Sequence, residues 1–116
     1  MDAVASLTLP ERVVLTAVTT LERDGETPVQ VNVVTNRCQT YTESLPDIGR
    51  LSEADVDGAL NTLEARELVE VSEMGETSPI GKGRPAFEPA TDADDLLVAL
   101  AADDQLEDIV ESPETA

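Results

Sequence analysis

The feature that most limits the fold of this chain is a succession of segments with helical periodicity, each preceded by a helix-start signal. Thr8 and Glu11 form a capping box, and the apolar residues of segment 9–21 recur behind it at helical spacing. This pattern predicts a first helix that ends near Asp24, where Gly25 favours the left-handed conformation that stops a helix. Because such a helix buries one face, the chain must pack other elements against it.

Two more helices are predicted after this stop. Pro28 is expected at the first position of the second helix, and Pro46 and Gly49 within segment 42–50 predict a connecting loop. The apolar face of the second helix is formed by Val31, Val34, Cys38 and Tyr41. The third helix begins at Ser52, which pairs with Asp55 in an acidic capping box, and ends around Arg66. Its apolar stripe consists of Val56, Ala59, Leu60 and Leu63.

Gly58 stands inside the third predicted helix, where glycine costs up to ~1 kcal/mol relative to alanine. We expect a close approach of another backbone to explain it.

After the third helix the periodicity changes. Leu68, Val69 and Val71 alternate with polar residues, which predicts a strand, and a segment rich in glycine and proline separates it from a second strand at residues 86–88. Prolines at 85 and 89 are expected to confine that second strand to a sheet edge. Thr91 and Asp94 open a fourth helix. Its apolar stripe comprises Leu96, Leu97, Leu100, Leu106, Ile109 and Val110.

The order helix, helix, helix, hairpin, helix predicts a mainly α fold with a small β-hairpin, a winged helix-turn-helix with a three-helix core, a wing and a C-terminal helix. We expect one domain over residues 1–110 and a disordered tail at 111–116.

Charge separates this chain from most domains of its size. It has 116 residues with 25 Asp plus Glu against 7 Lys plus Arg, a formal net charge of -18, yet 41% of its residues are hydrophobic. A disordered acidic tail would not be this hydrophobic. The scarcity of lysine and of aromatic residues is typical of cytosolic proteins of extreme halophiles, in which molar salt screens the carboxylates. The alternative is an ordinary acidic protein that binds a basic partner.

The inventory of reactive side chains argues against an enzyme. The chain has no histidine and one cysteine, Cys38, which is predicted to face the core, so catalytic triads, zinc sites and internal disulfides are excluded. We therefore predict no catalytic residue, no metal and no cofactor. The acidic N-terminus and the absence of a long apolar stretch predict a cytoplasmic protein with no membrane contact. No small-molecule substrate is indicated.

The rare cations are unevenly placed. Lys82 and Arg84 fall within three residues of each other at the predicted tip of the hairpin, next to Gly81 and Gly83. Glycines let a backbone come close to phosphates while the two side chains supply charge, so we predict that Lys82, Gly83 and Arg84 contact DNA. The alternative is a flexible loop with solubilising charges.

The outward face of the third helix is predicted to carry Glu53, Asp57, Asn61, Thr62 and Ala65. Asn61 can pair with adenine and Thr62 can contact a thymine methyl group, whereas the carboxylates repel phosphate. Arg50 just before this helix and Arg37 on the second helix are predicted to hold the flanking DNA backbone, and Ser52 at the start of the helix is predicted to bind DNA as well.

Three stretches between residues 9 and 89 make the sequence similar to a known family. They are LPERVVLTAVTTLERDGETPV, TYTESLPDIGRLSEADVDGALNTLEARELVEV and IGKGRPAFEP. In these stretches the chain resembles the C-terminal winged-helix domain of archaeal origin-recognition replication initiators, whose wing carries a Gly-basic-Gly-Arg sequence matched here by residues 81–84. The resemblance implies duplex DNA binding through Lys82, Arg84 and the exposed face of the third helix. The family's ATP-binding module is not matched, because no G-x-x-x-x-G-K-[ST] motif occurs.

The sequence thus favours a small winged-helix protein that binds double-stranded DNA, as a transcriptional regulator or a replication-associated accessory factor. The rival hypothesis is a winged-helix module that contacts another protein through the acidic third helix and does not bind DNA. The long stripe of the fourth helix is consistent with a homodimer through that helix, or with packing of the stripe on the first helix.

Overall fold

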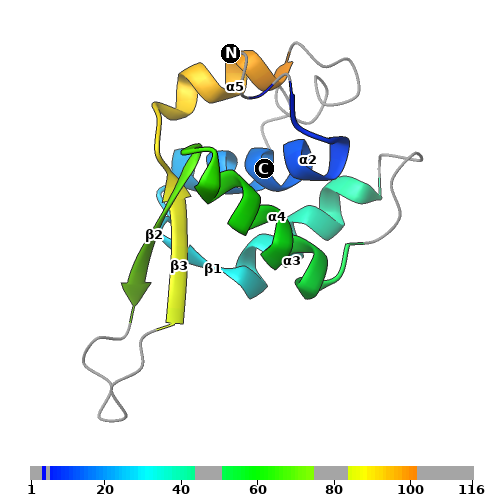
Figure 1. The fold of residues 1–116 in the computed structure, drawn as a ribbon, viewed down its shortest axis with the longest axis vertical. Coiled ribbons are helices and arrows are strands. Elements are labelled where there is room, and N and C mark those ends of the chain that lie inside the picture. Colours follow the sequence, from blue (N-terminus) through cyan, green and yellow to red (C-terminus); the bar gives the residue numbers. More distant parts are fainter. Residues whose placement is uncertain (1–3, 5, 44–50, 75–83, 102–116) are drawn as a thin grey trace.

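The computed structural model describes residues 4, 6–43, 51–74 and 84–101 of the chain. Its helices are α2 (Leu9–Arg23), α3 (Val31–Thr42), α4 (Glu53–Ala65) and α5 (Ala93–Ala101), and its strands are β1 (Val29–Gln30), β2 (Val69–Met74) and β3 (Arg84–Pro89). Helix α2 is central, because it contacts α3, α4, α5 and β3, and the sheet lies at one side of the helices (Figure 1). The predicted winged helix-turn-helix fold is confirmed.

Helix α2 begins as predicted and is buried along most of its length. The Thr8 hydroxyl accepts from the backbone N–H of Glu11 at 3.3 Å, and the Glu11 carboxylate accepts from the N–H of Thr8 at 3.0 Å. Every residue from Val13 to Leu21 is buried, threonines included. Their hydroxyls donate within the helix, as Thr19 does to the carbonyl of Leu15 at 2.6 Å, so these buried polar groups are satisfied.

Helix α3 begins later than the sequence predicts. Gln30 is its N-cap and Val31 its first residue, so the expectation of Pro28 at the first helical position is wrong. Val29 and Gln30 instead form β1, which pairs with Phe87 and Ala86 of β3. Burial of Val29 beside Phe87 outweighs the local start signal. The predicted apolar face of α3 is confirmed: Val34 and Cys38 are buried, and Val31 and Tyr41 pack half-buried against the core.

The sheet is antiparallel with strand order β1-β3-β2, so β3 is its central strand. The prediction that two prolines confine β3 to an edge is therefore wrong. Pro85 and Pro89 lie opposite Glu73 and Val69 of β2, outside the two positions at which β1 pairs. A central strand tolerates both prolines because β1 is only two residues long.

Helix α4 follows the sequence prediction closely. The Ser52 hydroxyl and the Asp55 carboxylate each accept the other residue's backbone N–H at 3.1 Å. The predicted stripe, Val56, Ala59, Leu60 and Leu63, is buried. Past the C-cap Arg66, Glu67 adopts a left-handed φ of 64° and the N–H of Leu68 donates to the carbonyl of Leu63 at 2.9 Å. This turn leads the chain directly from α4 into β2.

The expectation for Gly58 is wrong. A Cβ atom built on Gly58 meets no heavy atom within 4 Å, and the residue is exposed. No other backbone among the described residues therefore approaches it. Its φ is not in the left-handed range either, so neither packing nor backbone conformation within the described fold calls for glycine here.

Helix α5 begins at Ala93, between the Thr91 and Asp94 that the sequence indicates as its opening, and Asp92 caps it. The Asp92 carboxylate accepts from the N–H groups of Asp94 and Asp95 at 2.8 and 3.3 Å. The first part of the apolar stripe, Leu96, Leu97 and Leu100, is buried, and the helix contacts α2. Leu106, Ile109 and Val110 lie outside the described residues. The predicted end of the domain at residue 110 and the predicted tail at 111–116 lie outside them as well. Dimerisation through this helix stays a prediction.

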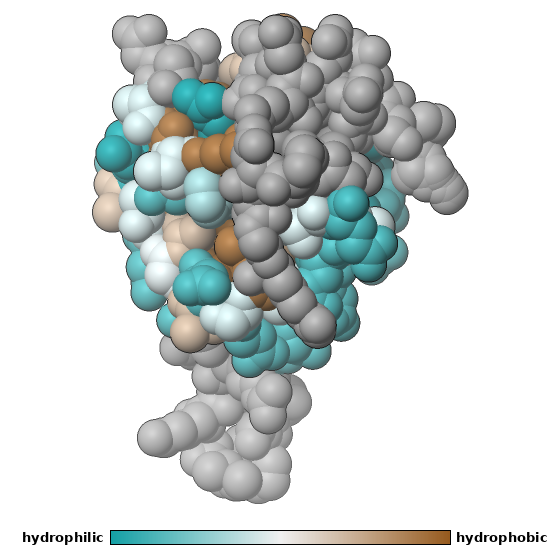
Figure 2. Space-filling view, turned by 90° about the vertical axis from the view of Figure 1, so that its right-hand side faces the viewer, coloured by the Kyte–Doolittle hydropathy of each residue, from teal (hydrophilic) through white to brown (hydrophobic). Residues whose placement is uncertain are grey.

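The described surface is mostly polar. On the face in Figure 2, hydrophobic atoms reach the coloured surface only in small areas between hydrophilic ones. Among the described residues, the exposed large hydrophobic side chains are Val71 and Val98. No helix in the described part of the chain is long and apolar enough to cross a membrane.

Candidate nucleic-acid interface

The hairpin of β2 and β3 extends away from the helices (Figure 1). At its far end Met74 pairs with Arg84, the first residue of β3. Lys82 and Gly83 belong to the segment that joins the two strands, and both lie outside the described residues. The structure therefore confirms the two strands of the wing and leaves the DNA contacts of Lys82, Gly83 and Arg84 as predictions.

The exposed surface of α4 divides into three rows of residues. Side chains at intervals of three and four share a helix face, so Ala54, Gly58, Asn61 and Ala65 form the outermost row, which we call the crest. A second row contains Glu53, Asp57 and Glu64, and we call it the β2-side row because its last member, Glu64, lines the groove beside β2. The row toward α2 contains Asp55 and Thr62. The carboxylates that the sequence places on the outward face thus lie beside the crest, and the crest carries no charge.

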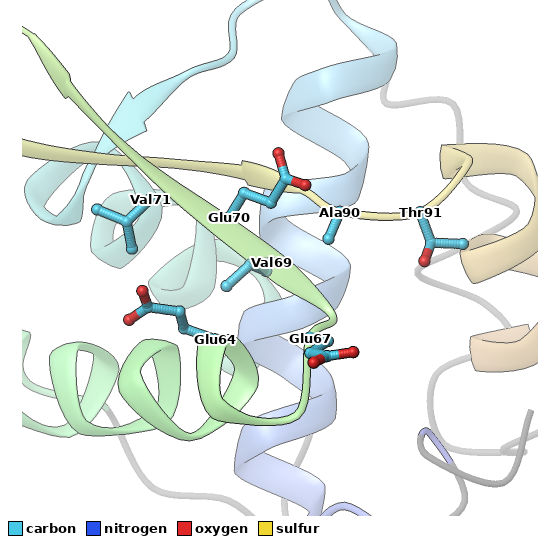
Figure 3. A pocket seen from close by; sticks show the side chains of 7 residues that line it. All are labelled: Glu64, Glu67, Val69, Glu70, Val71, Ala90 and Thr91. Carbon is cyan, nitrogen blue, oxygen red and sulfur yellow. The ribbon is translucent and has the colours of Figure 1, made fainter.

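A groove of about 630 Å³ separates the end of α4 from the hairpin (Figure 3). It is lined by Glu64, Glu67, Val69, Glu70, Val71, Ala90 and Thr91. Three of these side chains are exposed carboxylates, and Val71 adds an apolar side chain that is 38% exposed. In dilute salt this groove would repel a phosphate backbone.

A second groove, of about 490 Å³, lies on the opposite side of α4, toward the start of α2. It is lined by Thr8, Pro10, Glu11, Leu51, Ala54, Asp55, Gly58, Ala59 and Thr62. Its two carboxylates, those of Glu11 and Asp55, each accept a backbone N–H in a capping box. Because Gly58 has no side chain, the groove is open up to the backbone of α4.

The predicted site residues on α4 differ in what their side chains do. The Ser52 hydroxyl caps the helix, and the Thr62 hydroxyl donates to the carbonyl of Gly58 at 3.2 Å. Asn61 is exposed and makes no side-chain hydrogen bond to any described residue. Among these predicted residues, Asn61 is thus the one whose polar side chain is fully available for a ligand.

Arg37 is engaged inside the chain. Its Nη2 forms an ion pair with Oδ2 of Asp24 at 3.2 Å, and its Nη1 donates to Oγ1 of Thr20 at 3.3 Å. The same Thr20 oxygen lies 2.7 Å from the Tyr41 hydroxyl. Burial lowers the pKa of Arg37, but hydrogen bonds and charge interactions with Tyr41 and Asp24 outweigh it and raise the pKa above its ordinary value. These contacts use two of the five N–H donors of the guanidinium, and the side chain is 25% exposed, so DNA contact by Arg37 stays a prediction.

The remaining predicted contact and the other reactive groups add little to the interface. Arg50 lies outside the described residues. Arg66, at the end of α4, donates to the Ser6 hydroxyl at 2.8 Å. Cys38 is buried, and this burial raises the pKa of its thiol to about 12. No group of side chains in the described ranges could hold a metal ion.

Comparison with known proteins supports the fold. No protein-family model matches the sequence, and no curated protein matches it either. Among solved structures, the chain is similar to the Aeropyrum pernix ORC1 protein, determined in complex with DNA, with a TM-score of 0.79 and 20% sequence identity. The match covers 93% of this chain and 27% of the ORC1 chain. The likeness agrees with the winged-helix resemblance found in the sequence.

Proposed function

We propose that this chain binds duplex DNA, with the β2–β3 hairpin and α4 as the contacting elements. The observation that carries the proposal is the shared fold with ORC1, a protein whose structure contains DNA, over 93% of this chain. In a winged helix the third helix of the core and the wing contact neighbouring parts of a duplex. Here α4 and the hairpin hold those positions.

The two elements would contribute different interactions. Lys82 and Arg84 supply the positive charge that phosphate contacts need, and such contacts set affinity and register. The crest of α4 is uncharged and suits base edges. Carboxylates such as Glu64 oppose binding in dilute buffer, but at molar salt the Debye length is ~3 Å and this repulsion is largely screened. We place the protein in a salt-rich cytoplasm, as a transcriptional regulator or a replication-associated accessory factor and not an enzyme.

A second candidate function rests on the groove between α4 and β2. The exposed carboxylates of Glu64, Glu67 and Glu70 line this groove together with the partly exposed Val71. This combination favours a basic segment of another protein, whose aliphatic stems and charged ends would match it. Such a module would leave duplex DNA unbound.

Duplex binding across a series of KCl concentrations tests the proposal. Fluorescence anisotropy with a labelled random-sequence duplex gives the negative slope of log affinity against log salt concentration. The magnitude of this slope decreases by about 0.9 for each phosphate contact removed. Lys82→Ala and Arg84→Ala should each reduce the steepness by about that amount. Arg23→Ala is the matched control, because Arg23 is an exposed arginine at the end of α2 and belongs to neither contacting element.

Absence of duplex binding by the wild-type protein, at every salt concentration at which circular dichroism shows it folded, would refute the proposal. If all three substitutions changed the salt dependence of duplex affinity equally, the hairpin would not be part of the interface.

A further inference from the structure

Neither packing nor backbone conformation within the described fold explains why residue 58 is a glycine. Glycine inside a helix lowers stability by about 1 kcal/mol relative to alanine. Here an added Cβ would meet nothing within 4 Å, and the backbone does not require glycine. An alanine would therefore fit and would stabilise α4. A molecule that approaches the backbone of α4 closely would give glycine a role at this position.

The neighbours of Gly58 on the crest indicate what that molecule contacts. Ala54 and Ala65 have single-carbon side chains, and Asn61 carries the crest's one polar side chain. Because the side chains beside Asn61 on the crest are this short, the helix axis can come close to a flat surface. The Asn61 amide can then reach the base edges at the bottom of a DNA groove. An asparagine amide offers a donor and an acceptor side by side, which match N7 and N6–H₂ of adenine in the major groove.

We propose that Gly58 and Asn61 together form the base-recognition point of α4, at which the helix backbone seats against the major groove and the Asn61 amide recognises adenine. This inference rests on the proposed function, because it assigns the sequence preference of the same interface. It predicts that the preferred duplex site contains one A·T pair whose identity depends on Asn61.

A selection from a randomised duplex library in molar KCl tests the role of Asn61. The wild-type protein should enrich one invariant A·T pair, and Asn61→Ala should lose the preference at that pair by roughly 5- to 150-fold while keeping the rest of the site. Asn61→Gln retains an amide and should keep part of the preference. Asn36→Ala is the matched control, because Asn36 is an exposed asparagine on α3.

Gly58→Ala separates a role in recognition from a role in folding. The variant should have a higher melting temperature than the wild type, because it removes the helix penalty of glycine and creates no clash. It should nevertheless bind the selected duplex about 5-fold or more weakly, because the added methyl group holds the backbone away from the bases.

The outcomes distinguish the two levels of the proposal. No duplex binding by the wild type would refute DNA binding itself. Duplex binding with an unchanged base preference in Asn61→Ala, or unchanged affinity in Gly58→Ala, would leave DNA binding intact and overturn the recognition point. Capture of a protein helix by the crest, lost in Gly58→Ala while duplex affinity stays constant, would overturn it as well.

Discussion

The buried thiol of Cys38 gives a prediction whose size follows directly from the structure. Cys38 has no exposed surface, and burial raises its pKa from 9.0 to about 12. At pH 8 a thiol of pKa 9.0 is about one tenth thiolate, whereas a thiol of pKa 12 is about 0.01% thiolate. Because the thiolate is the reacting species, the folded protein should react with a disulfide reagent about 1000-fold more slowly than the unfolded chain, or slower still.

The same shift makes stability depend on pH. Folding favours the neutral thiol, so the stabilisation is fully present below pH 9 and is lost as the pH rises from 9 through about 12. At pH 10 the loss relative to pH 7 is about 1.4 kcal/mol. Cys38→Ala removes this component, so the variant's free energy of unfolding should decline less between pH 7 and pH 10 than that of the wild type.

Two measurements check these expectations. Thiol labelling at pH 8 is followed by absorbance with and without urea, and urea unfolding is followed by circular dichroism at pH 7 and pH 10 for both proteins, in molar KCl. Other groups that titrate near pH 10 are present in both and cancel in the difference. Labelling of the folded protein as fast as of the unfolded chain would refute the packing of α3 described above. An equal pH-dependent decline in both proteins would refute the assigned pKa.

Three further predictions concern the helices. Ser52→Ala removes the cap of α4 and should lower the free energy of unfolding by about 1 kcal/mol, measured by urea titration. Arg37→Ala should destabilise by no more than about 1 kcal/mol, because its ion pair with Asp24 is partly exposed, and a double-mutant cycle with Asp24→Ala isolates the pair. Asp57→Asn should tighten duplex binding at 0.2 M KCl by a few-fold at most, and by less at molar KCl, because salt screens the repulsion that it removes. Unchanged anisotropy titrations at both salt concentrations would show that the β2-side row of α4 does not face phosphate.

Helix positions were predictable because their signals are local. The capping boxes of Thr8 and Ser52 and the apolar stripes behind them lie within single segments, and the structure has both. The change to period two after Leu68 was enough to place β2. Errors arose where a contact joins distant segments. From the sequence alone, Val29 belongs to the start of the second predicted helix. In the structure it pairs with Phe87 of β3, and this pairing determines its strand conformation.

The candidate site was predictable only as to its elements. Exposure of the α4 face follows from helical periodicity, but the separation of a neutral crest from acidic rows needs the positions of β2 and α2. The engagement of Arg37 could not be foreseen, because Asp24 and Thr20 become its neighbours only when α3 packs on α2. A glycine within a helix is visible in the sequence, where it led us to expect a close approach of another backbone. The structure instead leaves open space around Gly58 among the described residues.

The short strand β1 also bears on the order in which the molecule folds. Its partners in β3 are more than fifty positions away along the chain, and closing a loop of that length costs roughly 3 to 4 kcal/mol of chain entropy. Two residue pairs cannot repay this alone, so β1 should join the sheet only after α2, α3 and α4 have brought its partners near. In native-state hydrogen exchange, the amides of β1 should open at lower free energy than those of α2, so β1 would separate from the middle of β3 while the helices stay folded.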